Sequence, residues 1–571
     1  LTVPAEPALT ASEPDRTQAW LDVVGPESAA RTWLDGLTSY DATFVVDPSL
    51  LLPLPPATDI TDAPLSDLIP TLEPDDGVDP DATEQPDSTD SVGSTAPGED
   101  QDPSSAATAT PDLPAQTPLG TLELQEATPV QQAELALQER IGELERSQLR
   151  WLPVADPDAA ALIDQGASAE VLERSMTASL PPSVLEADRL LQRGSHGVAW
   201  PAWNDLGDDR IAGLERIWAD PVTTVVIPRS LFTQSSGLNL AAVGTLDQNS
   251  GPALYGYDHT VSALLSPTQA GAGEGATTQA VLAHLLARYQ QSPANSGAMI
   301  IAPPRSAFLG ASALDDLTSA IEQAPWVDQV LAEDLPVAAD VRASTSTAPD
   351  PEPSPLSRGA IARVEQLRRT FDQIATVMQR QETVTTWSPV LDGLYSTRWR
   401  GNDEEWLSLL DLMESNVSTI VDGVRIQETS VNFLANEGLI QLTLVNDLPV
   451  GLRDLDLELV PGNARLRIVE QPQPIAIGAN SRATVQFRAE AVAAGQVPVS
   501  ATLTTPTGLQ IGEAQELDVQ VRPTGIWIYW VLGGVAGVIL VLGLTRAIRR
   551  PEPSGSRAVS SDALGNEMGP P

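Results

Sequence analysis

Apolar positions in the first part of the chain form short runs that alternate with amphipathic stretches. Runs such as Gly197–Trp200, Thr223–Ile227 and Ala298–Ala302 are separated by helix-like stretches of ten or more residues. This alternation is typical of βα units around a parallel sheet. We therefore expect an α/β domain with a barrel-like parallel sheet, built from residues 1–52 and 128–340. An open doubly wound sheet is the alternative.

An acidic segment, residues 53–127, separates the two parts of this pattern. Pro, Asp, Glu, Ser and Thr dominate the segment, and no basic residue occurs between Arg31 and Arg140. Such a composition buries too little apolar surface to offset the entropy of ordering the chain, so we predict a disordered insertion. Order is expected to return at Thr128-Pro129, a helix cap followed by proline at the first helical position.

Residues 341–423 carry a helical pattern only. Ile361, Val364 and Leu367 recur at steps of three and four and form one apolar stripe, and a second helix is predicted from Asp403 to Ile420. We expect these helices to pack on each other or on the α/β domain. A coiled-coil contact with a partner helix is the alternative.

The hydrophobic period changes to two in residues 424–523. Leu455, Leu457 and Leu459 alternate with acidic residues, and similar alternation recurs between turn-forming residues. Roughly seven short strands in about 100 residues are typical of an immunoglobulin-like β-sandwich. We predict an all-β domain of this type without a disulfide.

A stretch of 19 residues without charge, Ile526–Leu544, follows the predicted sandwich. Its length matches a membrane-crossing helix, and the arginines after it favour a cytoplasmic end. We expect a transmembrane helix at 525–545 and a cytoplasmic tail at 546–571. The protein would then be a single-pass plasma-membrane protein with its N-terminal ectodomain outside and a short Arg-rich tail inside; a buried core helix is the alternative.

Composition excludes several functional classes. The chain has no cysteine, and all 32 of its Lys and Arg residues are arginine. Without these side chains there is no disulfide, thiolate site, lysine Schiff base or Walker-type phosphate loop. The net charge of −45 argues against nucleic-acid binding, which needs clustered cations.

Two aspartates are candidate catalytic residues. Asp47 and Asp156 each follow a predicted strand, where an α/β barrel places its catalytic groups, and two carboxylates can perform glycoside hydrolysis. Each also precedes a proline, which is typical of a helix cap. The cap interpretation is the simpler one.

Four further residues are candidate ligand-binding residues. Trp200 and Trp203 follow a predicted strand and could stack on sugar rings or fill the end of the barrel. Asp258 could orient the imidazole of the adjacent His259. The three histidines have no metal-ligand spacing, so we expect neither a metal site nor a cofactor.

Several motifs resemble those of a known family. They are VVDPSLL (45–51), LPVADPDAAAL (152–162), TTVVIPRS (223–230), APPR (302–305), WRGND (399–403), VNDLPV (445–450) and VPVSATLTTPTG (497–508). The chain resembles an uncharacterised actinobacterial family of secreted single-pass membrane proteins, known only as a domain of unknown function. The resemblance implies a degenerate barrel similar to polysaccharide deacetylases followed by a β-sandwich. It also implies a gene near the flippase for the peptidoglycan precursor, and hence a cell-envelope role.

These observations favour a membrane-anchored extracytoplasmic protein of the cell envelope. The leading hypothesis is a non-catalytic module that binds cell-wall glycan or proteins of cell-wall synthesis, because the candidate acids and tryptophans form no complete catalytic set and the paired histidines of deacetylases are missing. One alternative is a carbohydrate-active hydrolase that uses Asp47 and Asp156. Another is a scaffold in which residues 355–421 bind a membrane partner.

Overall fold

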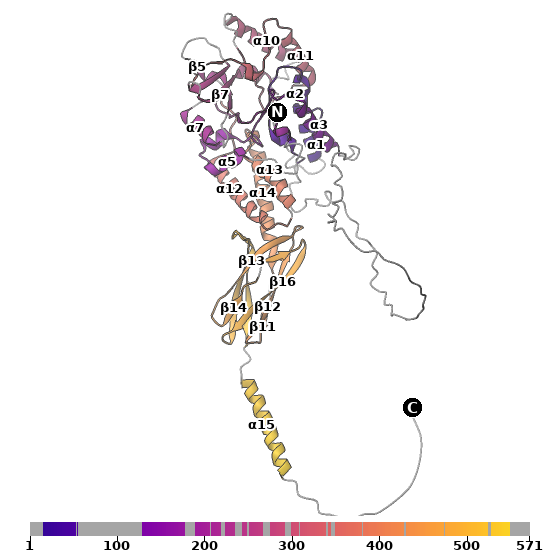
Figure 1. The fold of residues 1–571 in the computed structure, drawn as a ribbon, viewed down its shortest axis with the longest axis vertical. Coiled ribbons are helices and arrows are strands. Elements are labelled where there is room, and N and C mark those ends of the chain that lie inside the picture. Colours follow the sequence, from indigo (N-terminus) through magenta and orange to yellow (C-terminus); the bar gives the residue numbers. More distant parts are fainter. Residues whose placement is uncertain are drawn as a thin grey trace, which may run out of the picture. The chain divides into compact units, whose positions relative to one another are not determined.

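The computed structural model divides the chain into two compact units, Leu1–Val421 and Asp422–Pro571 (Figure 1). The structure describes residues 15–52, 54, 128–177, 189–205, 207–217, 223–234, 242–247, 250–266, 274–291, 298–305, 307, 309–338, 341–343, 349–379, 381–427, 430–472, 474–522 and 527–548. The predicted insertion at 53–127 lies outside these residues except for Leu54.

The first unit begins with two segments that are distant in sequence and adjacent in space. The first contains α1 (Asp15–Val24), α2 (Ala29–Leu37), β1 (Phe44–Val46) and the short 3-10 helix η2 (Pro48–Leu51). The second contains α3 (Pro129–Glu143) and β2 (Leu149–Trp151). Thr128 caps α3 through a reciprocal capping box with Gln131, as the Thr-Pro signal predicts.

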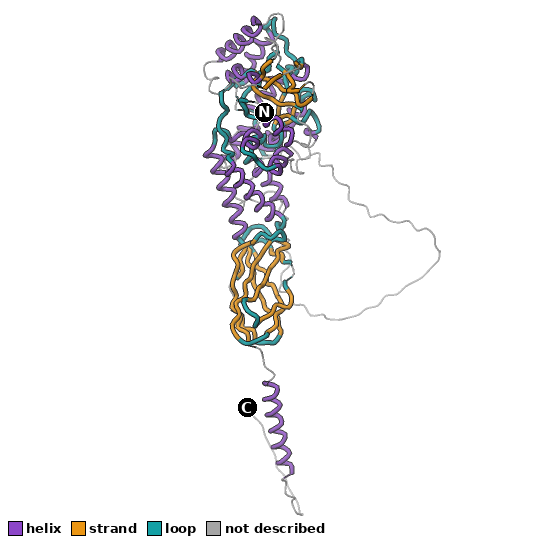
Figure 2. The backbone as a smooth tube through the Cα atoms, turned by 90° about the vertical axis from the view of Figure 1, so that its left-hand side faces the viewer, coloured by secondary structure: helices purple, strands orange, loops and turns teal. Residues whose placement is uncertain are grey.

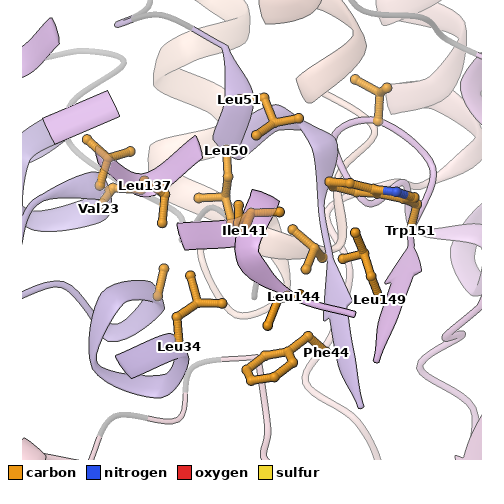
Figure 3. Close-up of a cluster of buried hydrophobic side chains, with 14 of the residues drawn as sticks. Val23, Leu34, Phe44, Leu50, Leu51, Leu137, Ile141, Leu144, Leu149 and Trp151 are labelled. Carbon is orange, nitrogen blue, oxygen red and sulfur yellow. The ribbon is translucent and has the colours of Figure 1, made fainter. Parts of the chain in front are cut away.

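Strands β1 and β2 pair in parallel, with Phe44 opposite Leu149 and Val46 opposite Trp151. Apolar side chains of both strands pack with those of α1, α2 and α3 in one hydrophobic core (Figure 3). The labelled side chains of this core are Val23, Leu34, Phe44, Leu50, Leu51, Leu137, Ile141, Leu144, Leu149 and Trp151. This core fixes the strand ends at which Asp47 and Asp156 lie.

A five-stranded sheet of order β3-β4-β7-β6-β8 continues the unit. The elements of this region are α4 (Ala159–Asp164), α5 (Ala169–Thr177), β3 (Val198–Ala199), α7 (Asp208–Ile217), β4 (Thr224–Pro228), η3 (Arg229–Leu231), β5 (Phe232–Gln234), β6 (Val243–Asp247), β7 (Ser250–Tyr257), α8 (His259–Leu264), α10 (Glu274–Gln291), α11 (Ala311–Glu322), η4 (Ala332–Asp334), β8 (Val337–Ala338) and β9 (Val341–Ala343). Strands β5 and β9 form a separate antiparallel pair.

The parallel strands form part of a barrel. Strand β4 pairs in parallel with both β3 and β7. Two isolated parallel bridges extend this arrangement: Arg150 of β2 pairs with Ser195, and Tyr257 of β7 pairs with Ile300. Strand β6, however, runs antiparallel to β7. Among the described residues the sheets are therefore half-barrels, and the predicted barrel-like parallel sheet is interrupted where β6 pairs antiparallel with β7.

The described residues of the helical segment form α12 (Arg358–Ala375), α13 (Gln381–Gly393) and α14 (Asp403–Asp422), with the 3-10 helix η5 (Thr397–Trp399) between the last two. The predicted stripe of α12 is buried. Arg363 of α12 donates hydrogen bonds to Asp411 and Glu414 of α14. The turn between α13 and α14 contacts the strand ends of the α/β part.

The described strands of the second unit form two packed β-sheets (Figure 2). One has the order β10-β12-β16-β14 and the other β11-β18-β17-β13-β15. The strands are β10 (Val424–Ile426), β11 (Ser430–Phe433), β12 (Glu437–Asn446), β13 (Leu452–Pro461), β14 (Leu466–Glu470), β15 (Ile475–Ile477), β16 (Ser481–Ala491), β17 (Gly495–Thr504) and β18 (Gln510–Val521). Leu455, Leu457 and Leu459 are buried, so the period-two pattern gave the correct inward face.

The last described element is helix α15 (Trp527–Ile548). Within the residues that the structure describes, no helix combines the length and apolar character needed to cross a membrane. This finding contradicts the predicted transmembrane helix at 525–545, the fold class that included it and the single-pass plasma-membrane localisation.

Candidate functional site

Polar side chains gather where the parallel strands of the first unit end. Asp47 follows β1, Asp156 lies beyond β2, Trp200 follows β3, and Arg305 lies beyond Ile300, which bridges to β7. The carboxyl ends of neighbouring parallel strands meet at one edge of a sheet, which is where α/β proteins bind ligands. We call this set of residues the strand-end cluster.

Asp47 is almost fully buried and acts as a helix cap. Its Oδ1 accepts hydrogen bonds from the backbone N–H groups of Ser49 and Ala155, each at 2.9 Å, and its side chain caps η2. Burial, with a smaller contribution from the Asp156 charge, raises the pKa of Asp47 to about 6. With 1% of its surface exposed, the carboxyl group has little access to a substrate.

Asp156 is held in an unusual backbone conformation. Ala155 and Asp156 have φ angles of 65° and 42°, in the left-handed region that non-glycine residues rarely occupy. The Asp156 carboxylate forms a bidentate ion pair with Arg305, in which Nη2 donates to Oδ1 at 3.0 Å. Its carbonyl accepts the N–H of Thr397 at 2.8 Å. The predicted cap is instead provided by Asp158, whose Oδ1 accepts the N–H of Ala161 at the start of α4.

Arg305 connects the buried acid to an aromatic ring. Its guanidinium lies 5.0 Å from the centre of the Trp200 ring and donates a hydrogen bond of 2.7 Å to the Trp200 carbonyl. A guanidinium over an indole face is favourable electrostatically, and the Asp156 ion pair fixes its plane. Sequence reasoning quoted Arg305 only within the APPR motif and assigned it no role.

Three aromatic side chains share one face of the parallel strands. Trp200, Tyr255 and Tyr257 are each partly exposed and pack on a small apolar cluster of Leu152, Val198 and Val226. The Trp200 and Tyr257 rings are 6.2 Å apart and tilted by 58°. Burial raises the pKa of both tyrosines, so both are neutral at physiological pH. This surface, the aromatic face, presents rings and hydroxyl groups together.

The turn between α13 and α14 covers the other side of the strand-end cluster. Arg400 forms a buried ion pair with Asp158, with Nη2 and Oδ1 at 2.9 Å. The Nε atom of Arg398 is buried and has no hydrogen-bond partner among the described residues. Burial lowers the pKa of Arg398, and the nearby carboxylates of Asp47 and Asp156 oppose this effect. The sequence pattern predicted no role for Arg398 or Arg400, because it does not show that the turn between two helices contacts a strand end.

The remaining predicted site residues have local structural contacts. Trp203 is buried beneath Arg210, whose guanidinium lies 5.4 Å from the ring centre. Asp258 caps α8, and His259 is the first residue of that helix. No group of three or more His, Asp or Glu side chains among the described residues is placed to hold a metal ion.

Comparison with known proteins provides a family. Residues 38–556 match the model of a family of unknown function, DUF6049. The chain belongs to the DUF6049 family. This membership agrees with the sequence resemblance to an uncharacterised family, and it carries no activity, source organism or gene neighbourhood with it.

No curated protein matches this DUF6049 chain. Among solved structures it is similar to WR4, an MSP family member of C. elegans, at 10% identity and a TM-score of 0.15 over 18% of this chain and 99% of that one. It is also similar to E. coli alpha-2-macroglobulin, at 17% identity and a TM-score of 0.15 over 18% of this chain and 7% of that one. The periplasmic chaperone SfaE shares 16% identity, with a TM-score of 0.14 over 18% of this chain and 58% of that one. TM-scores this low carry no argument about function.

Proposed function

We propose that this DUF6049 protein is a non-catalytic glycan-binding protein whose ligand is a polysaccharide of the cell envelope. The binding surface is the aromatic face together with Arg305. The resemblance to envelope proteins motivates the choice of polysaccharide, and the geometry of the strand ends motivates the binding mode.

The partly exposed aromatic face carries this proposal. In a closed α/β barrel these inward positions would be filled by packed aliphatic side chains, whereas here Trp200, Tyr255 and Tyr257 remain accessible. Sugars present apolar C–H faces and hydroxyl edges, which match aromatic rings next to polar groups. The Arg305 guanidinium and the tyrosine hydroxyls are hydrogen-bonding groups at the same surface.

The engagement of the acids supports a non-catalytic role. Glycoside hydrolysis needs two carboxyl groups that face a substrate. Here the Asp47 Oδ1 accepts two backbone N–H groups, and both oxygens of Asp156 bind Arg305. Both residues are buried, at 1% and 5% exposure.

The test is cosedimentation of the full chain with insoluble peptidoglycan and with purified wall polysaccharide. We expect saturable binding by the wild type. Trp200→Ala should weaken binding at least about 30-fold, because truncating a central aromatic contact costs roughly 2 kcal/mol or more. Tyr289→Ala is the matched control, since Tyr289 of α10 is exposed and its ring contacts Trp326, which is not part of the aromatic face.

Three measurements complete this test. Circular dichroism and thermal unfolding of each variant establish that lost binding is not lost folding, and Trp200→Phe should retain part of the affinity. Absence of wild-type binding to either polymer would contradict the proposal. Release of reducing sugar that Asp47→Asn and Asp156→Asn abolish would favour the hydrolase instead.

A further inference from the structure

A second polar cluster lies immediately beyond the aromatic face. Pro228 of β4 pairs with Tyr257 of β7, so Arg229 and Asp258 are the next residues along these two strands. Arg288 of α10 approaches Asp258, with 3.9 Å between Nε and Oδ2. A strand rises by roughly 3.3 Å per residue, so Asp258 lies about that far beyond Tyr257 along the chain. This distance is shorter than the length of one sugar residue. We call Arg229 and Arg288 the arginine pair.

Among the described residues, the carboxylates near the arginine pair do not neutralise its positive charge. Asp258 is the carboxylate that acts on Arg229, and its Oδ1 already accepts the N–H groups of Thr260 and Val261 at 3.1 and 3.2 Å. Arg229 is partly buried and has no hydrogen bond or ion pair with any residue that the structure describes. Burial, followed by the positive charge of Arg288, lowers the pKa of Arg229 to about 10. Arg229 is therefore still charged at neutral pH.

An oxyanion would supply the counter-charge that Arg229 lacks among the described residues. A partly buried cation without a partner is unfavourable, and carboxylate or phosphate oxygens form strong charge-assisted hydrogen bonds with arginine. The chain as a whole carries a net charge of −45, which repels polyanions at long range. Binding of an anionic ligand thus needs a local cationic site, and the arginine pair provides one.

We propose that the ligand is an acidic glycan, whose carboxylate or phosphate group binds the arginine pair while a neighbouring sugar lies on the aromatic face. This inference rests on the proposed glycan-binding function and specifies the chemical class of the glycan. It assigns a ligand-binding role to Arg229 and Arg288, which sequence reasoning did not consider.

The experiment measures binding of the full chain to two matched pairs of polymers. Polygalacturonate and its methyl ester test a carboxylate, and phosphomannan and dephosphorylated mannan test a phosphate. We expect at least one charged polymer to bind at least about tenfold more tightly than its uncharged match, and 0.5 M NaCl to reduce this preference. Arg229→Gln and Arg288→Gln should each remove most of it, whereas Arg229→Lys should retain part.

The control variant is Arg363→Gln, which removes a guanidinium from the surface of α12. Its preference for charged polymer should equal that of the wild type. Equal binding of charged and uncharged polymers, lost in Trp200→Ala, would overturn the acidic-glycan inference and leave glycan binding intact. A charge preference that survives both Arg→Gln substitutions would overturn the assignment to the arginine pair. Binding to none of the four polymers, with binding to peptidoglycan or wall polysaccharide retained, would overturn the acidic-glycan inference alone.

Discussion

At the residue scale, Asp47 is a buried acid that has a structural role and a pKa above its usual value. Its Oδ1 ties the end of β1 to the backbone of Ala155, so it joins two strand ends that are about one hundred residues apart in sequence. Its pKa of about 6 arises first from burial and then from Asp156. The charged form is thus less favourable in the folded protein than in the unfolded chain.

This raised pKa makes folding stability depend on pH. Between pH 3.8 and about 6 the folded protein holds a proton on Asp47 that the unfolded chain has released, so stability falls as pH rises through this window. We expect the Asp47 contribution to fall by about 1 kcal/mol from pH 5 to pH 7.5. Urea unfolding at both pH values should show this loss in the wild type, and Asp47→Asn should not show it. Asp41→Asn, at an exposed position on the same segment, should behave as wild type. An unchanged pH dependence in Asp47→Asn would contradict the raised pKa.

At the element scale, the turn between α13 and α14 holds the end of β2 in its strained conformation. Thr397 donates its N–H to the Asp156 carbonyl at 2.8 Å, and the Tyr395 carbonyl accepts the N–H of Asp158 at 2.7 Å. Two consecutive non-glycine residues at positive φ persist only where surrounding contacts determine the backbone. The helical segment is therefore part of the architecture of the candidate site.

The buried ion pair between Asp158 and Arg400 should be the most sensitive contact of this turn. Arg400→Gln leaves the 1% exposed carboxylate of Asp158 without its cation, so we expect a loss of about 3 kcal/mol in the free energy of unfolding. Arg363→Gln breaks exposed ion pairs and should cost less than about 1 kcal/mol. Chemical denaturation followed by tryptophan fluorescence compares the two variants. Equal losses would show that burial of this pair does not determine its contribution.

At the scale of the whole molecule, the chain divides near Val421 into a mixed α/β unit and a unit that contains the β-sandwich. Each unit has its own buried core, with Leu34 in the first and Leu459 in the second. Separate cores are the physical basis for separate cooperative unfolding.

We therefore expect two unfolding transitions in calorimetry. Leu34→Ala and Leu459→Ala remove equal side chains from fully buried positions, at 0% and 1% exposure, and each should cost about 2–5 kcal/mol. Each variant should lower only the transition of its own unit, and only Leu34→Ala should affect glycan binding. A single transition lowered by both substitutions would show that the two units unfold together.

The sequence by itself determined the features that depend on neighbouring residues. The period of two assigned the inward faces of the sandwich, the Thr128-Pro129 signal placed the start of α3, and Asp47 before proline predicted a cap. Each of these features rests on side-chain alternation or on hydrogen bonds within a few residues. Local pattern was therefore sufficient for them.

Only the tertiary structure decided which distant residues meet. It paired β1 with β2, brought Arg305, Arg398 and Arg400 to the strand ends, and placed Asp158 rather than Asp156 at the cap of α4. It also showed half-barrel sheets with an antiparallel strand, β6, where the βα alternation predicted a barrel-like parallel sheet, and it contradicted the membrane span predicted from apolar composition. Contacts across one hundred or more residues depend on how whole elements pack, and a local pattern of hydrophobic positions does not contain that information.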